Sequence, residues 1–204
     1  MNKYRLYLVT DEHQDIEALT FVIKEAIAGG VTMVQIREKH GDIRAFIQRA
    51  MVIKALLLNT GIPLIINDRI DVALAVDADG VHLGQSDMPA DIARRLIGPN
   101  KILGLSVENE TQLEHAQSLP IDYLGISAIF PTPTKTDTVY TWRIDGLSKA
   151  VKSSKLPLVA IGGINKENIQ TVAQTHVAGI ALVSAICHAQ SPKIACEELN
   201  QLIG

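Results

Sequence analysis

The sequence predicts an α/β protein, a (β/α)8 TIM barrel formed as one compact domain over residues 1–204. Short apolar segments alternate with segments of helical periodicity along the whole chain. The apolar segments are continuous runs, which is typical of parallel strands that helices cover. Eight strand–helix units follow one another without a linker or low-complexity segment. That number favours a closed barrel over an open doubly wound sheet.

Each strand is expected at a short apolar run, with a helix in the longer segment that follows it. Gly29-Gly30 ends the first helix, because glycine readily takes the left-handed conformation found there. The expected strands are Tyr4–Val9, Met33–Ile36, Pro63–Ile66, Gly80–Leu83, Ile102–Leu105, Tyr123–Ile126, Leu158–Ile161 and Ile180–Val183. The expected helices include Ile16–Ala28, Ile43–Leu58, Asp91–Leu96, Glu110–Gln117, Ile144–Val151, Lys166–Thr175 and Pro192–Leu202.

Composition narrows the class of protein. The chain is 47% hydrophobic but only 4% aromatic, so we expect an aliphatic core. A net charge of −3 argues against nucleic acid as the main partner. No apolar run approaches the ~18 residues that would span a membrane, and no signal peptide is recognisable. Cys187 and Cys196 lack metal-type spacing, so we interpret them as free thiols of a cytoplasmic protein.

Polar residues collect where the second strand ends, and in a barrel the active site lies at that end of the strands. The segment reads Gln35-Ile-Arg37-Glu-Lys39. Strand alternation puts Gln35, Arg37 and Lys39 on the inner side of the barrel, with Val34 and Ile36 toward the helices. Burying three such groups is costly without a ligand or a partner. A ligand site and an internal salt-bridge network both remain open from this strand alone.

Two carboxylates follow the next two strands. Asp68 comes directly after the third strand, and Asp87 lies in the loop after the fourth. They can pair with Arg37 and Lys39, or they can hold Mg²⁺ that bridges a bound diphosphate. Mg²⁺ is typically held by one or two carboxylates together with substrate phosphates. The neighbouring cations favour the metal interpretation.

The loop after the sixth strand has the chemistry of a phosphate site. It reads Phe130-Pro-Thr-Pro-Thr-Lys135. Its two prolines stiffen the backbone, while Thr132, Thr134 and Lys135 supply hydroxyl donors and a positive charge. The alternative is a surface loop rich in turn-forming residues.

Three further strand ends carry candidate residues. Gly162-Gly163 follows the seventh strand and Val183-Ser184 closes the eighth, the region where barrels of this kind often bind phosphate. The glycines can also serve tight packing alone. Ser106 closes the fifth strand, where a serine usually caps a helix. His82, inside an apolar strand, is expected to be a core histidine.

Six motifs in order along nearly the whole chain resemble the thiamine phosphate synthase family. They are Gln35-Ile-Arg-Glu-Lys39, Ile66-Asn-Asp-Arg69, Gly80-Val-His-Leu-Gly-Gln85 with Asp87, Phe130-Pro-Thr-Pro-Thr-Lys135, Ile161-Gly-Gly-Ile164 and Val183-Ser-Ala-Ile186. The resemblance implies an enzyme that joins two small molecules, hydroxymethylpyrimidine diphosphate and a thiazole phosphate, with release of diphosphate. It also implies a dissociative reaction assisted by Mg²⁺.

The resemblance assigns roles by position. Asp68 and Asp87 would hold Mg²⁺, while Arg37, Lys39, Ser106 and Lys135 would be catalytic. The pyrimidine diphosphate would be bound by Gln35, Ile36, Arg37, Glu38, Lys39, Asn67, Ser106 and Lys135. The thiazole phosphate would be bound by Thr132, Pro133, Thr134, Gly163, Val183 and Ser184.

Two other functions fit the same barrel. The related thiazole tautomerases use a histidine after the fifth strand, where this chain has Ser106-Val-Glu108. A barrel that only binds thiamine precursors would be expected to have lost Lys135 or one of the two aspartates, and all three are present. Both observations favour the synthase.

Overall fold

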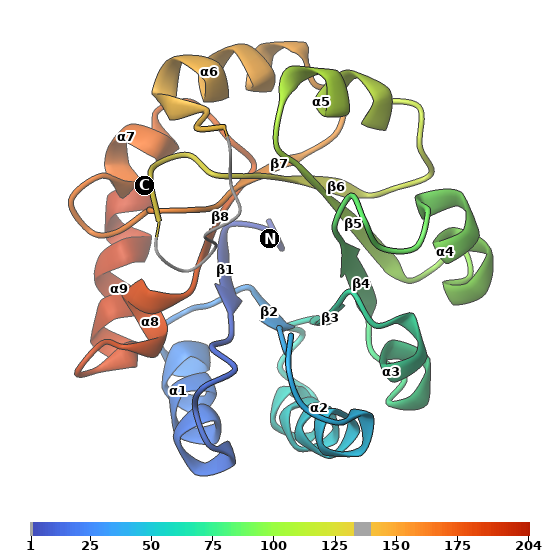
Figure 1. The fold of residues 1–204 in the computed structure, drawn as a ribbon. Helices are drawn as coiled ribbons and strands as arrows, with labels where there is room; N and C mark the ends of the chain where they lie inside the picture. Colours follow the sequence, from blue (N-terminus) through green and yellow to red (C-terminus); the bar gives the residue numbers. More distant parts are fainter. Residues whose placement is uncertain (1, 133–139) are drawn as a thin grey trace.

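In a computed structural model, the protein forms a closed parallel barrel surrounded by helices (Figure 1). The structure describes residues 2–132 and 140–204. The strands run in chain order around the barrel, and β1 closes it by pairing with β8, Leu6 opposite Ile180. This confirms the predicted fold class. The strands are β1 (Leu6–Val9), β2 (Met33–Ile36), β3 (Leu64–Asn67), β4 (Gly80–Leu83), β5 (Ile102–Val107), β6 (Tyr123–Ile126), β7 (Leu158–Ala160) and β8 (Gly179–Leu182).

Helices fill the segments between the strands. Side-chain caps set several of their first residues: Asp15 accepts from the Ala18 amide, and Asp42 accepts from the amides of Arg44 and Ala45. As expected, the first helix ends before Gly29, and Gly30 has φ of 89°. The helices are α1 (Ile16–Ala28), α2 (Ile43–Leu57), α3 (Ile70–Ala75), α4 (Ala90–Ile97), α5 (Glu110–Ala116), α6 (Arg143–Ser153), α7 (Ile169–Ala173), α8 (Ser184–Cys187) and α9 (Pro192–Ile203).

Most helices match their predicted bounds to within one or two residues, and three differ further. The sequence predicts no range for helix α3 or helix α8, because neither is long enough to show a helical repeat. Helix α7 begins at Ile169, three residues later than expected. The preceding residues form a turn in which Asn165 Oδ1 accepts from the Glu167 amide and Asn168 Oδ1 accepts from the Asn165 amide. Side-chain hydrogen bonds of this kind compete with a helix.

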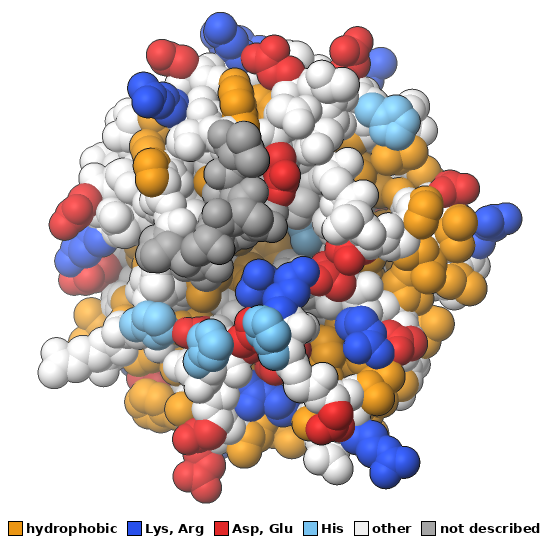
Figure 2. Space-filling view, in the orientation of Figure 1, with side chains coloured by type: hydrophobic (Ala, Val, Ile, Leu, Met, Phe, Trp, Pro, Cys, Tyr) orange, Lys and Arg blue, Asp and Glu red, His pale blue; other side chains and the backbone are white. Residues whose placement is uncertain are grey.

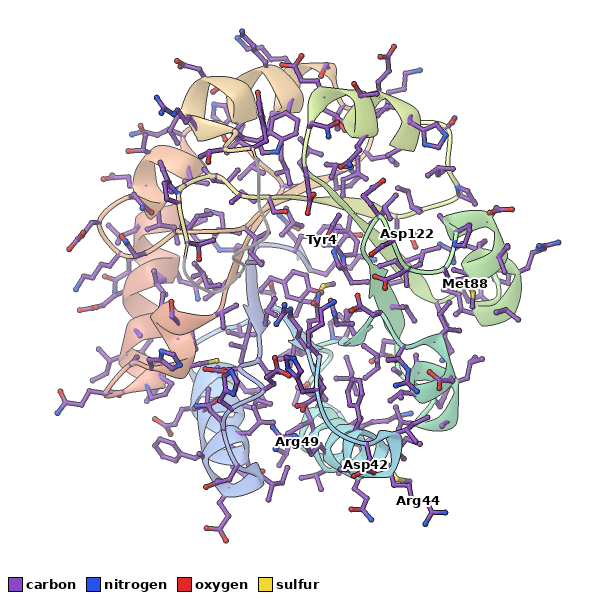
Figure 3. All side chains as sticks on the ribbon, viewed as in Figure 1. Tyr4, Asp42, Arg44, Arg49, Met88 and Asp122 are labelled. Atoms are coloured by element: carbon purple, nitrogen blue, oxygen red, sulfur yellow. The ribbon has the colours of Figure 1, made fainter. Side chains whose placement is uncertain are left out.

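Strand alternation divides the buried residues between two cores. The outer core lies between strands and helices and includes Val34 and Ile36, as predicted. The inner core fills the barrel and includes Tyr7, Met33 and Tyr123. Tyr4, labelled in Figure 3, also belongs to the inner core. Strand residues of opposite parity therefore serve different purposes, and the inner set points along the inside of the barrel toward its mouth.

The described part of the chain contains neither a membrane-spanning helix nor a disulfide. None of its helices is long and apolar enough to cross a membrane. Cys187 and Cys196 form no disulfide, and both are buried.

Candidate active site

A cavity of about 650 Å³ opens at the carboxyl ends of the strands. Figure 2 looks into this mouth and shows basic, acidic and histidine side chains gathered along one side of the hollow. Its lining includes residues from the ends of all eight strands or from the loops that follow them. The prediction that chemistry-capable residues would meet at this end of the barrel is therefore confirmed in position.

On the β2–β4 side, a lysine and two aspartates form one charged group. Lys39 Nζ contacts the Asp68 carboxylate directly. Burial raises the pKa of Asp68, a hydrogen bond with Asp87 adds to the rise, and Lys39 opposes it. Asp87 in turn accepts a 2.7 Å hydrogen bond from the Gly84 amide. Two adjacent carboxylates with one lysine as counter-charge favour the arrival of a further cation.

The backbone of Asp68 directs its carboxylate into this group. Asp68 has φ of 61°, a left-handed conformation that non-glycine residues seldom adopt. Its amide donates to the carbonyl of His82 at 2.8 Å, which extends the pairing of β3 with β4 by one residue. Strain of this kind is characteristic of functional sites.

Asn67, one residue earlier, holds an unsatisfied donor. The side chain is only 6% exposed and lines the cavity. Within residues 2–132 and 140–204, Asn67 Nδ2 has no hydrogen-bond partner. A buried donor without an acceptor costs about 1–3 kcal/mol, so the position is suited to a ligand that brings one.

A chain of hydrogen bonds crosses the floor of the cavity. Gln35 Nε2 donates to the Tyr7 hydroxyl at 2.7 Å, and that hydroxyl lies 3.0 Å from the hydroxyl of Tyr123. Tyr123 reaches His82 Nδ1 at 2.8 Å, and His82 Nε2 lies 2.9 Å from Ser106 Oγ. Burial raises the pKa of both tyrosines, so their hydroxyls stay protonated at neutral pH. The two tyrosines therefore contribute neutral hydroxyl groups to the floor.

Ser106 and His82 partly differ from expectation. Ser106 lies within β5, and Asn109 caps the following helix instead, by accepting from the Gln112 amide. His82 is buried as expected, at 9% exposure, but its ring also lines the cavity.

Glycines make room for these rings. A Cβ on Gly104 would lie 2.2 Å from Tyr123 Cζ and 2.5 Å from His82 Nδ1, distances that real atoms do not reach. Gly125 similarly faces the His82 ring, with Cε1 at 2.9 Å from the Cβ position. The aromatic floor therefore requires small residues on β5 and β6.

The opposite side of the cavity is built by the loops after β6, β7 and β8. The Phe130 amide donates to the Gly162 carbonyl at 3.0 Å, which joins the first two loops. Gly163 has φ of 67°, and a Cβ there would meet the Pro131 carbonyl at 2.7 Å. This glycine therefore does serve close packing, and it also lines the cavity.

The family model described as thiamine monophosphate synthase matches residues 6–186. The chain belongs to the thiamine monophosphate synthase family. A thiamine-phosphate synthase of Vibrio campbellii is 68% identical over 203 residues, with 100% of both chains covered. One from Albidiferax ferrireducens is 51% identical and covers 98% of this chain and 91% of its own.

Solved structures agree with the family assignment. A thiamine phosphate pyrophosphorylase from Pyrococcus furiosus superimposes with a TM-score of 0.89 at 40% identity, covering 99% of this chain and 96% of its own. A 3-hexulose-6-phosphate synthase, at 17% identity and a TM-score of 0.71, shares the fold alone. The thiamine-phosphate synthase activity expected from the motifs is thereby confirmed, and the protein is a transferase enzyme.

Most positions that the synthase family assigns lie around one cavity. Three do not line it: Ile36 is fully buried in the outer core, Glu38 pairs with Arg49 at 3.0 Å, and Asp87 hydrogen-bonds with Asp68. Figure 3 shows Arg49 on α2, outside the ring of strands. Pro133, Thr134 and Lys135 fall outside the described residues. The positions that line the cavity are Gln35, Arg37, Lys39, Asn67, Asp68, Ser106, Thr132, Gly163, Val183 and Ser184.

Several lining residues of this synthase were not singled out from the sequence. Tyr7 and Tyr123 lie in apolar strands, where an aromatic residue usually packs. Asp11 and Glu12 lie between β1 and α1, and His188 lies between α8 and α9. The Leu6–Val9 strand followed by Thr10-Asp11-Glu12 is the one available signal, because it repeats the pattern of polar residues after an apolar strand.

Proposed function

We propose that this synthase transfers the pyrimidinylmethyl group of 4-amino-2-methyl-5-hydroxymethylpyrimidine diphosphate to the nitrogen of 4-methyl-5-(2-phosphoethyl)thiazole or its carboxylated tautomer. The bond between the methylene carbon and the diphosphate oxygen breaks, and diphosphate leaves with the electron pair. A carbon–nitrogen bond then forms, giving thiamine phosphate. The observation that carries this proposal is the division of one cavity between a charged β2–β4 side and a loop-built β6–β8 side.

The β2–β4 side suits the diphosphate. Arg37 and Lys39 line it with positive charge. The family resemblance assigns Lys135 to the same diphosphate site. Asp68 and Asp87 are the residues that would hold Mg²⁺. The described residues contain no group of three potential ligands, which fits an ion that completes its coordination with substrate oxygens. When bound, Mg²⁺ would supply positive charge to the departing diphosphate.

The floor suits the pyrimidine ring. Gln35 and Ser106 stand at the two ends of the hydrogen-bonded chain, and both line the cavity. Asn67 Nδ2 adds a donor that has no acceptor among the described residues. A heteroaromatic ring with nitrogen acceptors and an exocyclic amine can engage such a set from its edge.

The β6–β8 side suits the monophosphate of the thiazole. Thr132, Gly163, Val183 and Ser184 all line it, and Pro133 and Thr134 are added from the sequence pattern. A hydroxyl and backbone amides near a glycine are ordinary phosphate ligands. The two substrates would then meet above the floor with their phosphates on opposite sides.

A dissociative path matches the residues that the cavity offers. Arg37 and Lys39 would stabilise the negative charge that grows on the leaving diphosphate, and Lys135 would assist from its loop. The ring amine of the substrate stabilises the pyrimidinylmethyl cation, so no protein nucleophile is required. Positioning and electrostatic stabilisation would then supply most of the rate enhancement.

A direct assay tests the proposal. Purified protein, Mg²⁺ and the two substrates are mixed, and thiamine phosphate and diphosphate are quantified over time. Equal amounts of both products are expected, with none when Mg²⁺ is chelated. If active substrates give no product, the proposed reaction is wrong, and a tautomer-exchange assay with the thiazole alone would then test the tautomerase alternative.

We further propose that the protein acts in the cytoplasm. Cys187 and Cys196 are both reduced and buried, which is the usual state of cysteines in a reducing compartment. Fractionation of the source cells, followed by immunodetection, tests this location.

A further inference from the structure

The loop between β1 and α1 contacts the loop after β2, although α1 and β2 separate the two loops in the sequence. Glu12 Oε2 accepts hydrogen bonds from the backbone amides of Lys39 at 2.8 Å and His40 at 3.0 Å. The ring Nδ1 of His40 lies 3.1 Å from the same oxygen. The Glu12 side chain is only 11% exposed, although the hydrogen bonds that it accepts lie at the protein surface.

The same carboxylate contacts Arg37 only through a long ion pair. Glu12 Oε1 lies 4.0 Å from Arg37 Nη1, beyond hydrogen-bond distance. The Arg37 backbone is instead fixed by Thr10, whose hydroxyl oxygen accepts from the Arg37 amide at 3.1 Å. The β1–α1 loop therefore holds the main chain at both ends of the Arg37–Lys39 segment, and the Arg37 guanidinium makes only a long ion pair with Glu12.

The β1–α1 loop is itself anchored on its other side. Asp11 Oδ2 lies 2.7 Å from His188 Nε2, just after α8, and Gln14 Nε2 donates to the Cys187 carbonyl at 3.0 Å. Arg49 of α2 donates to the Gln14 carbonyl at 3.0 Å. These three contacts order the loop before any ligand binds. The loop can therefore act as a rigid support, because little further conformational entropy is lost when the ligand arrives.

Glu12 also remains charged under ordinary conditions. Burial would raise its pKa, but hydrogen bonds from the amides of Lys39 and His40, together with the His40 ring, outweigh that effect, and the pKa of Glu12 is lowered. A charged acceptor makes shorter and stronger hydrogen bonds to backbone amides than a neutral one.

We propose that Glu12 is a positioning residue for the diphosphate half of the site. By binding the main chain at Lys39 and His40, it sets the direction in which the Arg37 and Lys39 side chains enter the cavity. Neutralising or removing Glu12 leaves both cations present but poorly aimed. This inference rests on the proposed diphosphate site, and it assigns to the β1–α1 loop a role that its sequence position alone does not reveal.

The test measures diphosphate binding and steady-state kinetics in Glu12→Ala and Glu12→Gln. Calorimetry with inorganic diphosphate and Mg²⁺ should show a dissociation constant raised about tenfold or more for Glu12→Ala. Glu12→Gln should lie between it and the parent, because its amide oxygen still accepts but carries no charge. The KM for the pyrimidine diphosphate should rise in parallel, while the KM for the thiazole phosphate stays within about twofold.

Glu17→Gln is the matched control. Glu17 is an exposed acidic residue in the first turn of α1, so it carries the same charge close to Glu12 in sequence but does not line the cavity. Its diphosphate affinity should equal that of the parent. Amide hydrogen exchange supplies a readout independent of activity: protection at Lys39 and His40 should fall in Glu12→Ala and stay unchanged in Glu17→Gln.

The outcomes separate this inference from the proposed function. If the parent protein binds no diphosphate, the proposed half-site is wrong. If the parent binds diphosphate and Glu12→Ala binds it equally well, the role of Glu12 is refuted. An equal rise in both KM values, with exchange increased throughout the chain, would also refute it, because the variant would then have lost general stability.

Discussion

The hydroxyl of Tyr123 lies 2.8 Å from Nδ1 of His82, although the two residues are 41 positions apart. The contact joins β6 to β4 across the inside of the barrel, with β5 between them. It completes a buried path of hydrogen bonds from Gln35 on β2 to Ser106 on β5. The polar floor of the site is therefore a product of barrel closure.

Replacing Tyr123 by phenylalanine should show how much this contact contributes to the stability of the protein. Tyr123→Phe removes one hydroxyl and leaves the Tyr7 hydroxyl and His82 Nδ1 each short of a buried partner. We expect a loss of about 1–3 kcal/mol in the free energy of unfolding, measured by urea denaturation. Tyr140→Phe is the control, because Tyr140 is 43% exposed, and it should change stability by less than about 0.5 kcal/mol. Equal stability of both variants would contradict the proposed floor.

Gly104→Ala should be far more damaging than an ordinary glycine substitution. The added Cβ would lie 2.2 Å from Tyr123 Cζ, so a ring or a strand must move. We expect a midpoint of thermal unfolding lowered by at least several degrees, or poor soluble yield. Gly146→Ala is the comparison: its Cβ meets Trp142 at 3.5 Å, an ordinary contact, and alanine favours the α6 helix. Circular dichroism melts of the two variants decide the matter.

Substitutions in the proposed diphosphate half should reduce turnover without unfolding the protein. Arg37→Ala and Asp87→Ala should each lower kcat/KM by about 10²-fold or more, because each removes charge placed for the leaving group. Far-ultraviolet circular dichroism should match that of the parent. Arg44→Ala offers a control: Arg44 is an exposed cation on α2, labelled in Figure 3 well away from the barrel mouth. Near-normal activity in both site variants would overturn the assignment.

The two cysteine thiols should be unreactive in the native state. Burial raises the pKa of Cys187 and of Cys196 to about 12. Native protein should therefore alkylate slowly with iodoacetamide at pH 8, and protein in urea rapidly, as mass spectrometry can follow.

The same thiols predict a change of stability with pH. Unfolding lowers each pKa toward 9, so the native state holds more protons between these values. The contribution to stability is complete below about pH 9 and is lost as the pH rises toward 12. Replacing both cysteines with alanine should remove this part of the pH dependence. A parent protein whose stability follows the same alkaline profile as that variant would contradict the prediction.

The barrel could be predicted because each strand is a continuous apolar run. Met33–Ile36, Gly80–Leu83 and Tyr123–Ile126 match the expected bounds. Strand alternation also correctly predicts that Gln35 faces the inside of the barrel and Ile36 the outside. The range of helix α3 could not be predicted, because its six residues, Ile70–Ala75, do not complete two helical turns.

The parts of the site that escaped prediction depend on contacts distant in sequence. Tyr7 and Tyr123 hydrogen-bond across 116 positions, and only the closed barrel brings them together. Glu12 faces Lys39 because two loops happen to be neighbours at the barrel mouth, 27 positions apart. Sequence patterns report which face a residue occupies, but they do not report which side chains meet on it.

The contact between Glu12 and the loop after β2 has a consequence for how this loop can change over time. Glu12 binds two main-chain amides, and every residue except proline carries that amide. Position 40 can thus accept many side chains while the support stays in place. A proline there would delete one of the two donors. We expect natural or selected variation at His40 to be broad and to exclude proline. The loop could then vary in sequence at this position while Glu12 continues to fix the backbone that carries Arg37 and Lys39.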